Sequence, residues 1–175
     1  MDKTPVSAGY SADGYIIDQD RFTEQRYRTM PVSWNGCGPI AAYNLRRAAG
    51  QETTLREVCA ELEALHRVNM PGPTSMRALR LYLGKYLPAC RESQGREAAL
   101  AAAAESYAGI FRYWEGREPH FISYMRMPEG DFRFFNVSDG LEDCRMPMEQ
   151  FGREHLLGGY VAVFALNADA SMVRL

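Results

Sequence analysis

The chain changes its hydrophobic pattern near residue 108, and this change constrains the fold more than any other feature. Between residues 37 and 107, apolar side chains recur at the three- and four-residue spacing of amphipathic helices. From residue 109 onward, short aromatic-rich runs alternate with glycine and proline, a pattern typical of antiparallel strands. Helices followed by strands predict an α+β fold in which an N-terminal helical lobe precedes an antiparallel sheet.

Turn-forming residues divide both parts into predicted elements. Pro39 lies just inside the start of the first helix and Gly50 just past its end, the usual punctuation of a helix. The predicted helices cover residues 40–49, 54–66, 75–84 and 96–107, with a short one at 148–156. The predicted strands cover residues 110–114, 121–125, 131–137 and 160–166, with a possible short one at 15–17.

Length and charge limit the organisation and the partners of the chain. At 175 residues, it is expected to form one domain, residues 1–175, with the polar residues 1–30 as an arm packed over it. The 20 Lys and Arg residues nearly balance the 22 Asp and Glu residues, so no strong positive field is available to attract nucleic acid. The oligomeric state cannot be read from this composition.

No apolar run approaches the roughly 20 residues that cross a bilayer, and the first residues lack the hydrophobic segment of a signal peptide. We therefore expect no membrane span and a cytoplasmic location. A secretion signal removed from the chain would change the compartment without changing the chemistry.

The four cysteines and three histidines are scattered in a way that argues against metal binding. The cysteines lie at positions 37, 59, 90 and 144, with no CxxC spacing, and no histidine lies within four residues of another or of a cysteine. Zinc sites need clustered ligands, so we expect no metal and no cofactor. A chain of this length does not depend on disulfides, which leaves reduced thiols, one of which can serve as a nucleophile.

Cys37 has the strongest sequence context for such a nucleophile. It lies in Trp34-Asn35-Gly36-Cys37-Gly38-Pro39, at the predicted start of a helix, where unpaired N–H groups and the helix dipole favour a thiolate. An ordinary thiol is only a few per cent ionised at neutral pH, so a second group is needed. The alternative is a small residue chosen for packing at a helix start. Cys59 lies on an apolar helical stripe and is predicted to be core, while Cys90 and Cys144 lie in apparent loops.

Among the histidines, His120 is the candidate general base. Pro119 favours an extended conformation before it, and a predicted strand follows directly, so its ring would be held rigidly at a sheet edge. A histidine that merely fills a strand edge is the alternative. We expect His66 to lie at the end of a helix and His155 to lie near a helix C-terminus, with structural roles.

A general base needs a third group that orients its ring. The strand after the predicted Pro128-Glu129-Gly130 turn ends in Asn136, and Asp139 follows shortly after. In a hairpin the end of the second strand returns beside the start of the first, which brings Asn136 or Asp139 next to His120. We favour Asn136, because asparagine within an aromatic strand has weak propensity there, whereas Asp139-Gly140 makes a good turn on its own.

The order of Cys37, His120 and Asn136, with helix before sheet, resembles papain-like cysteine peptidases, and more narrowly the peptidase C39 and C39-like branch. Cys37-Gly38-Pro39, His120-Phe121-Ile122 and Asn136 match the Cys-Gly-Pro helix start, the His-Phe-aliphatic strand and the orienting Asp or Asn of that branch. The resemblance spans residues 30 to 166 and implies a papain-like fold. No ATPase or membrane segment of the exporter-linked members is present, so the expected relative is free-standing.

One position departs from the pattern. In the family, a glutamine about six residues before the cysteine completes the oxyanion hole together with the cysteine N–H, and here that position is Pro31. Asn35 and Gln25 are the nearby amides that could substitute, and Asn35 is closer in sequence.

These residues predict a thiol hydrolase that acts on a peptide or another amide. Cys37 would attack the carbonyl, His120 would move the proton, Asn136 would orient His120, and Asn35 would stabilise the oxyanion. Acyl transfer and deamidation use the same chemistry. The missing glutamine keeps open a second function, that of a degenerate domain which binds a peptide or leader segment without cutting it.

Overall fold

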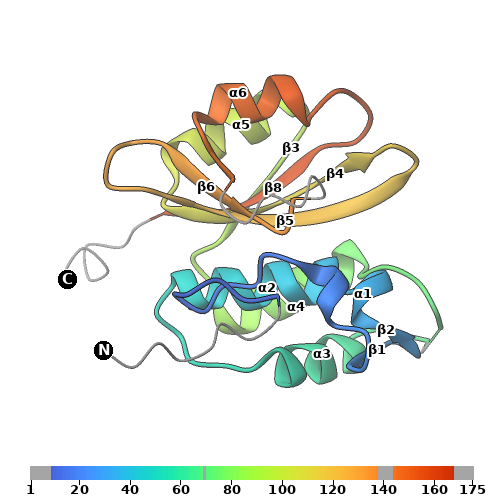
Figure 1. Cartoon of the computed structure of the whole chain (residues 1–175). Coiled ribbons are helices and arrows are strands. Elements are labelled where there is room, and N and C mark those ends of the chain that lie inside the picture. The colour runs from blue at the N-terminus through green and yellow to red at the C-terminus, as the bar shows by residue number, and fades with distance from the viewer. Residues whose placement is uncertain (1–8, 69, 138–143, 168–175) are drawn as a thin grey trace, which may run out of the picture.

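A six-stranded antiparallel sheet lies between two layers of helices (Figure 1). The computed structural model describes residues 9–68, 70–137 and 144–167. The helices are η1 (Gln19–Arg21), α1 (Val32–Asn35), α2 (Cys37–Ala48), α3 (Leu55–Ala64), α4 (Met76–Tyr86), α5 (Arg96–Glu105) and α6 (Met148–Glu154). The strands are β1 (Arg26–Tyr27), β2 (Met30–Pro31), β3 (Arg91–Gln94), β4 (Ala108–Glu115), β5 (Glu118–Arg126), β6 (Phe132–Phe135), β7 (Cys144–Met146) and β8 (Ala162–Leu166).

The sheet follows the order β3-β8-β4-β5-β6-β7, and β1 and β2 form a separate two-stranded ribbon. Strands β4 and β5 are the longest and pair from Ala108 with Met125 to Glu115 with Glu118. Strand β6 is shorter, and its pairing with β5 stops at Ser123 and Phe135. The first residues of β5 therefore extend beyond the end of β6.

Both faces of the sheet are buried, which explains why its strands contain aromatic runs rather than a clean alternation of apolar and polar residues. Ile110, Phe121 and Phe164 pack in the core shared with α2, α3 and α4. Their chain neighbours Phe111 and Ile122 pack in a second core, against α5 and α6 on the opposite face. The period of two along each strand thus supplies two hydrophobic cores.

Helix α2 is buried along most of its length and packs against β5. The glycines at its start permit close packing there. A Cβ on Gly38 would collide with the side chain of Thr74, and one on Gly36 would collide with Val32. The Gly-Cys-Gly sequence therefore lets the N-terminus of α2 lie tightly against its neighbours.

The described part of the arm, residues 9–30, packs along α2 and the sheet. The side chain of the buried Asn44 on α2 accepts a hydrogen bond from the N–H of Ile16 (2.8 Å) and donates one to its carbonyl (2.9 Å). The carboxylate of Asp13 pairs with Arg133 of β6 at 2.6 Å. These contacts hold the arm against α2 and β6.

The α+β papain-like architecture expected from the sequence is confirmed. The five longer helices and the four strands predicted between residues 110 and 166 occur where they were expected, with ends shifted by a few residues. Strands β3 and β7 were missed, so Cys144 lies in a strand rather than in a loop. Helix α5 covers the far face of the sheet instead of joining the other N-terminal helices. At residues 15–17, where a short strand was expected, only Ile16 forms an isolated bridge, with Tyr10.

Within residues 9–68, 70–137 and 144–167, no helix combines the length and the apolar character needed to cross a bilayer.

Replacing Asn44 with alanine would leave the N–H and carbonyl groups of the fully buried Ile16 without hydrogen bonds. We expect the Asn44→Ala variant to lose about 2–6 kcal/mol of free energy of unfolding in urea, since each of the two unsatisfied buried groups costs about 1–3 kcal/mol. The exposed Arg56→Ala on α3 is the control and should change the stability by less than about 0.5 kcal/mol. Equal changes in the free energy of unfolding for the two variants would show that the Asn44 hydrogen bonds do not stabilise the packing of the arm.

Candidate active site

A cleft of about 330 Å³ lies where the start of α2, the arm and the β4–β5 hairpin meet. Its lining includes Cys37, His120 and Asn136, three of the residues singled out in the sequence. They come from a helix start, a strand start and the end of a neighbouring strand. The fold thus brings together groups that are far apart along the chain.

Cys37 is the first residue of α2 and is only 6% exposed. As the first residue of α2, Cys37 has a main-chain N–H without an acceptor in its own helix. This N–H can donate to a bound group beside the thiol.

The other cysteines lie in different surroundings. Burial raises the pKa values of Cys59 and Cys90 to about 12, so both remain thiols at neutral pH. Cys59 packs in the core as predicted, and Cys144 is buried in β7.

His120 is the third residue of β5, in the part of the strand that extends past β6. Its Nε2 lies 3.0 Å from the main-chain carbonyl oxygen of Asn136. A carbonyl can only accept, so Nε2 carries a hydrogen. The remaining ring nitrogen, Nδ1, is the one available to Cys37, which lines the same cleft and raises the pKa of the ring. In the neutral ring, Nδ1 therefore carries the lone pair.

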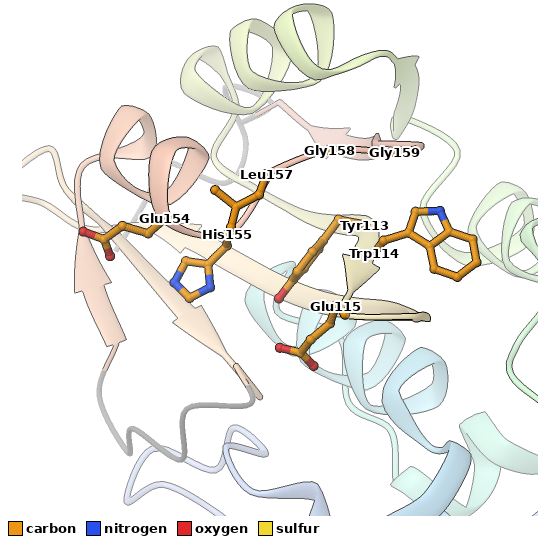
Figure 2. Close-up of a pocket in the computed structure, with 9 residues that line it drawn as sticks. Tyr113, Trp114, Glu115, Glu154, His155, Leu157, Gly158 and Gly159 are labelled. Carbon is orange, nitrogen blue, oxygen red and sulfur yellow. The ribbon is translucent and has the colours of Figure 1, made fainter.

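The charge state of His120 depends on this partner. Burial alone would lower the pKa of the ring, but the hydrogen bond with Cys37, the charge of Cys37, the carboxylate of Glu115 and the carbonyl of Asn136 together raise it above its usual value. Glu115 lies at the end of β4, beside Tyr113 (Figure 2). These groups therefore favour protonation of the ring by more than burial disfavours it.

Asn136 lies beside His120, as the hairpin geometry predicts, but the contact involves a different atom from the one expected. The residue follows β6 with a φ of 60°, a left-handed conformation that asparagine tolerates better than most residues. Its main-chain carbonyl, not its side chain, bonds to His120. The alternative residue, Asp139, lies outside the described residues.

The side chain of Asn136 bonds to Gln19 of η1 instead. Its Oδ1 accepts from the main-chain N–H of Gln19 at 3.0 Å, and its Nδ2 donates to Oε1 of Gln19 at 3.1 Å. Gln19 also lines the cleft, and its Nε2 donates one hydrogen bond to the carbonyl of Ser33 at 3.1 Å.

Asn35 is not placed to serve as the expected oxyanion donor. Its Nδ2 donates to the carbonyls of Tyr27 and Gly72, at 3.0 and 3.1 Å. An amide nitrogen has only two hydrogens, so both are used. The other suggested amide, Gln25, donates to the sulfur of Cys59. Neither residue is among those that line the cleft, so these contacts do not support the predicted oxyanion role for Asn35 or Gln25.

Gln19 is the amide that sequence reasoning missed. It precedes Cys37 by far more than the family spacing, and it reaches the cleft because the arm folds back across the start of α2. No periodicity or local motif marks it. The only local signal is Asp18, whose side chain caps the short η1 helix.

The remaining histidines have structural contacts. His66 accepts from the N–H of Ser75 and hydrogen-bonds to the carbonyl of Leu62. His155 follows α6 and stacks on Phe151. It lines a second hollow of about 700 Å³ (Figure 2). Glu115 lines both this hollow and the cleft.

No protein family profile matches this sequence, and no similar curated protein was found. The fold is similar to the crystal structure of the peptidase domain of Streptococcus ComA, a bi-functional ABC transporter involved in a quorum sensing pathway. The TM-score is 0.50 at 17% sequence identity, over 75% of this chain and 91% of that domain. At this identity the likeness concerns the fold, and it supports a C39-like arrangement of helices and sheet.

Proposed function

We propose that the chain is a cysteine peptidase-like hydrolase that cleaves a peptide or another amide bond. The observation that carries this proposal is that Cys37, at the start of α2, and His120 line the same cleft, where the carbonyl of Asn136 holds Nε2 of His120. Nucleophile, base and orienting group in one cleft form the arrangement that thiol hydrolysis requires.

In the proposed reaction, Nδ1 of His120 accepts the proton of Cys37, and the thiolate attacks the carbonyl carbon of the substrate. The negative charge that develops on the carbonyl oxygen needs hydrogen-bond donors. The N–H of Cys37 is one donor, and the second hydrogen of Gln19 Nε2 is the other. Gln19 thus takes the role that the sequence suggested for Asn35 or Gln25.

Collapse of this intermediate breaks the C–N bond, and His120 gives its proton to the leaving amine. The acyl group remains on Cys37 as a thioester. His120, now neutral, activates a water molecule that hydrolyses the thioester and restores the thiol. Every step uses the same Nδ1 atom, because Nε2 is held by the carbonyl of Asn136.

The surroundings of the cleft support an extended substrate that is not strongly acidic. The second hollow adjoins the cleft across Glu115 and provides room beyond the reacting bond. Asp18, Asp20, Glu115 and Glu118 line the cleft, and no Lys or Arg of the described ranges does so. Carboxylates on the substrate would meet like charges there.

A domain that binds a peptide without cutting it is the second candidate. Its main support was the missing glutamine, and Gln19 in the cleft weakens that support. The experiments below separate the two functions.

Cys37 should react with iodoacetamide at about pH 6 at least about tenfold faster than Cys59 or Cys90, because only a thiolate is nucleophilic at this pH. The burial-raised pKa values of the other two thiols, about 12, keep them protonated. The rates can be measured by mass spectrometry of the labelled peptides. A His120→Ala variant should lose the preference. Uniform labelling of the wild-type cysteines would favour the peptide-binding domain instead.

Hydrolysis of a mixed fluorogenic peptide library should fall by about 10³-fold or more in both Cys37→Ala and His120→Ala. When residues act as one catalytic unit, removal of any one of them abolishes most of the rate. Cys90→Ala is the matched control, since Cys90 lies outside the cleft lining, and it should keep the wild-type rate. If the two cleft variants remained active, another site would have to perform the hydrolysis.

The titration midpoint of His120, followed by NMR of the ring protons, should lie above the usual value of 6.5. Burial lowers this pKa, and the largest opposing contributions come from Cys37, so Cys37→Ala should lower the midpoint. Glu115→Gln should lower it less, because Glu115 contributes less than Cys37. An unchanged midpoint in Cys37→Ala would mean that the ring does not contact the thiol.

A further inference from the structure

We propose that the side chain of Asn136 acts on the reaction through Gln19 and not through His120. Its main-chain carbonyl holds the base, while its side-chain amide positions the oxyanion donor. Asn136 is then a positioning residue with two separable contacts. The inference rests on the proposed hydrolase function and assigns a different role to the third residue of the site.

The contact with His120 does not require an asparagine side chain. It is made by the main-chain oxygen of residue 136 at 3.0 Å, and it depends on the positive φ of 60° that turns the chain after β6. Glycine adopts this conformation at least as readily. A glycine at this position would keep the orienting carbonyl and remove only the side chain.

The contact with Gln19 does require the amide. Both polar atoms of the Asn136 side chain bond to the same residue, one to its main-chain N–H and one to its Oε1. Asn136 is only 7% exposed, so water cannot easily replace these two bonds. No other residue in the described ranges bonds to Oε1 of Gln19.

The hydrogen-bond chain also determines which way the amide of Gln19 points. The N–H of Gln19 can only donate, so the atom facing it must be Oδ1 of Asn136, and the other atom, Nδ2, must donate to Oε1 of Gln19. At the far end, the carbonyl of Ser33 can only accept and therefore faces Nε2. Main-chain groups at both ends require the same orientation, which leaves the second hydrogen of Nε2 as the available donor.

Two reagents that react at Cys37 separate the two contacts. Alkylation by iodoacetamide forms a C–S bond and expels iodide, so it requires the thiolate but generates no oxyanion. Acylation by p-nitrophenyl acetate passes through a tetrahedral oxyanion, expels p-nitrophenolate and leaves an acetyl thioester on Cys37. A residue that acts through the oxyanion donor should affect only the second reaction.

The experiment measures both rates across pH in the wild type, Asn136→Gly, Gln19→Ala and the double variant. Acylation should fall by about 10²–10³-fold in Gln19→Ala and by about tenfold or more in Asn136→Gly, because a displaced donor loses much of its effect. The double variant should be no slower than Gln19→Ala, since both substitutions act on one interaction. The alkylation rate and its pH profile should stay as in the wild type in all three.

The Asn136→Asp variant distinguishes the two roles further. Aspartate keeps the acceptor that could orient His120 but lacks the donor that holds Oε1 of Gln19. We expect it to slow acylation as Asn136→Gly does. Thermal unfolding of each variant confirms that it is folded before the rates are compared.

Several results would overturn the inference. One is a shifted alkylation profile in Asn136→Gly, and another is a normal acylation rate in Asn136→Asp. Strictly additive losses in the double variant would contradict it as well. A wild-type chain that reacts slowly with both reagents would instead contradict the proposed hydrolase, and the inference would fall with it.

Discussion

The packing of α2 against β5 is the contact on which the site depends. It places Cys37, the first residue of the helix, beside His120, the third residue of the strand. The small residues at the start of α2 allow this approach, since a Cβ on Gly38 would collide with Thr74. Because β6 ends before it covers the start of β5, the ring of His120 remains accessible from the cleft. The start of β5, which β6 leaves uncovered, and the start of α2 thus form the space that holds the thiol and the imidazole.

Asn136 joins this pair to the arm. A short strand that ends in a left-handed residue turns its carbonyl toward His120 and its side chain toward Gln19. The same residue therefore contacts the segment before α2 and the strand after it. Such a residue limits how far the arm and the sheet can move relative to each other, because one buried amide is bonded to both.

The sequence predicts those features that arise from local signals. The helix start at Cys37 and the strand at His120 follow from proline, glycine and periodicity, and both elements are confirmed. Hairpin geometry predicts that Asn136 lies next to His120. Whether its main chain or its side chain bonds to the ring depends on the φ angle of Asn136, which no local sequence pattern reveals. Gln19 was missed because only the folded arm brings it to the cleft. Strands β3 and β7 are short and carry polar residues, so they lack the aromatic pattern that marked the others.

The arm is therefore part of the cleft wall and not only a cover for the hydrophobic core. A chain shortened to begin at residue 32 would keep α2, the six-stranded sheet, Cys37 and His120. It would lose Gln19, the contacts of Asn44 with Ile16, and the ion pair of Asp13 with Arg133. Such a protein would retain Cys37 in a cleft that has lost the part of its wall formed by the arm. Domain boundaries drawn from α2 and the six-stranded sheet alone would cut through this cleft.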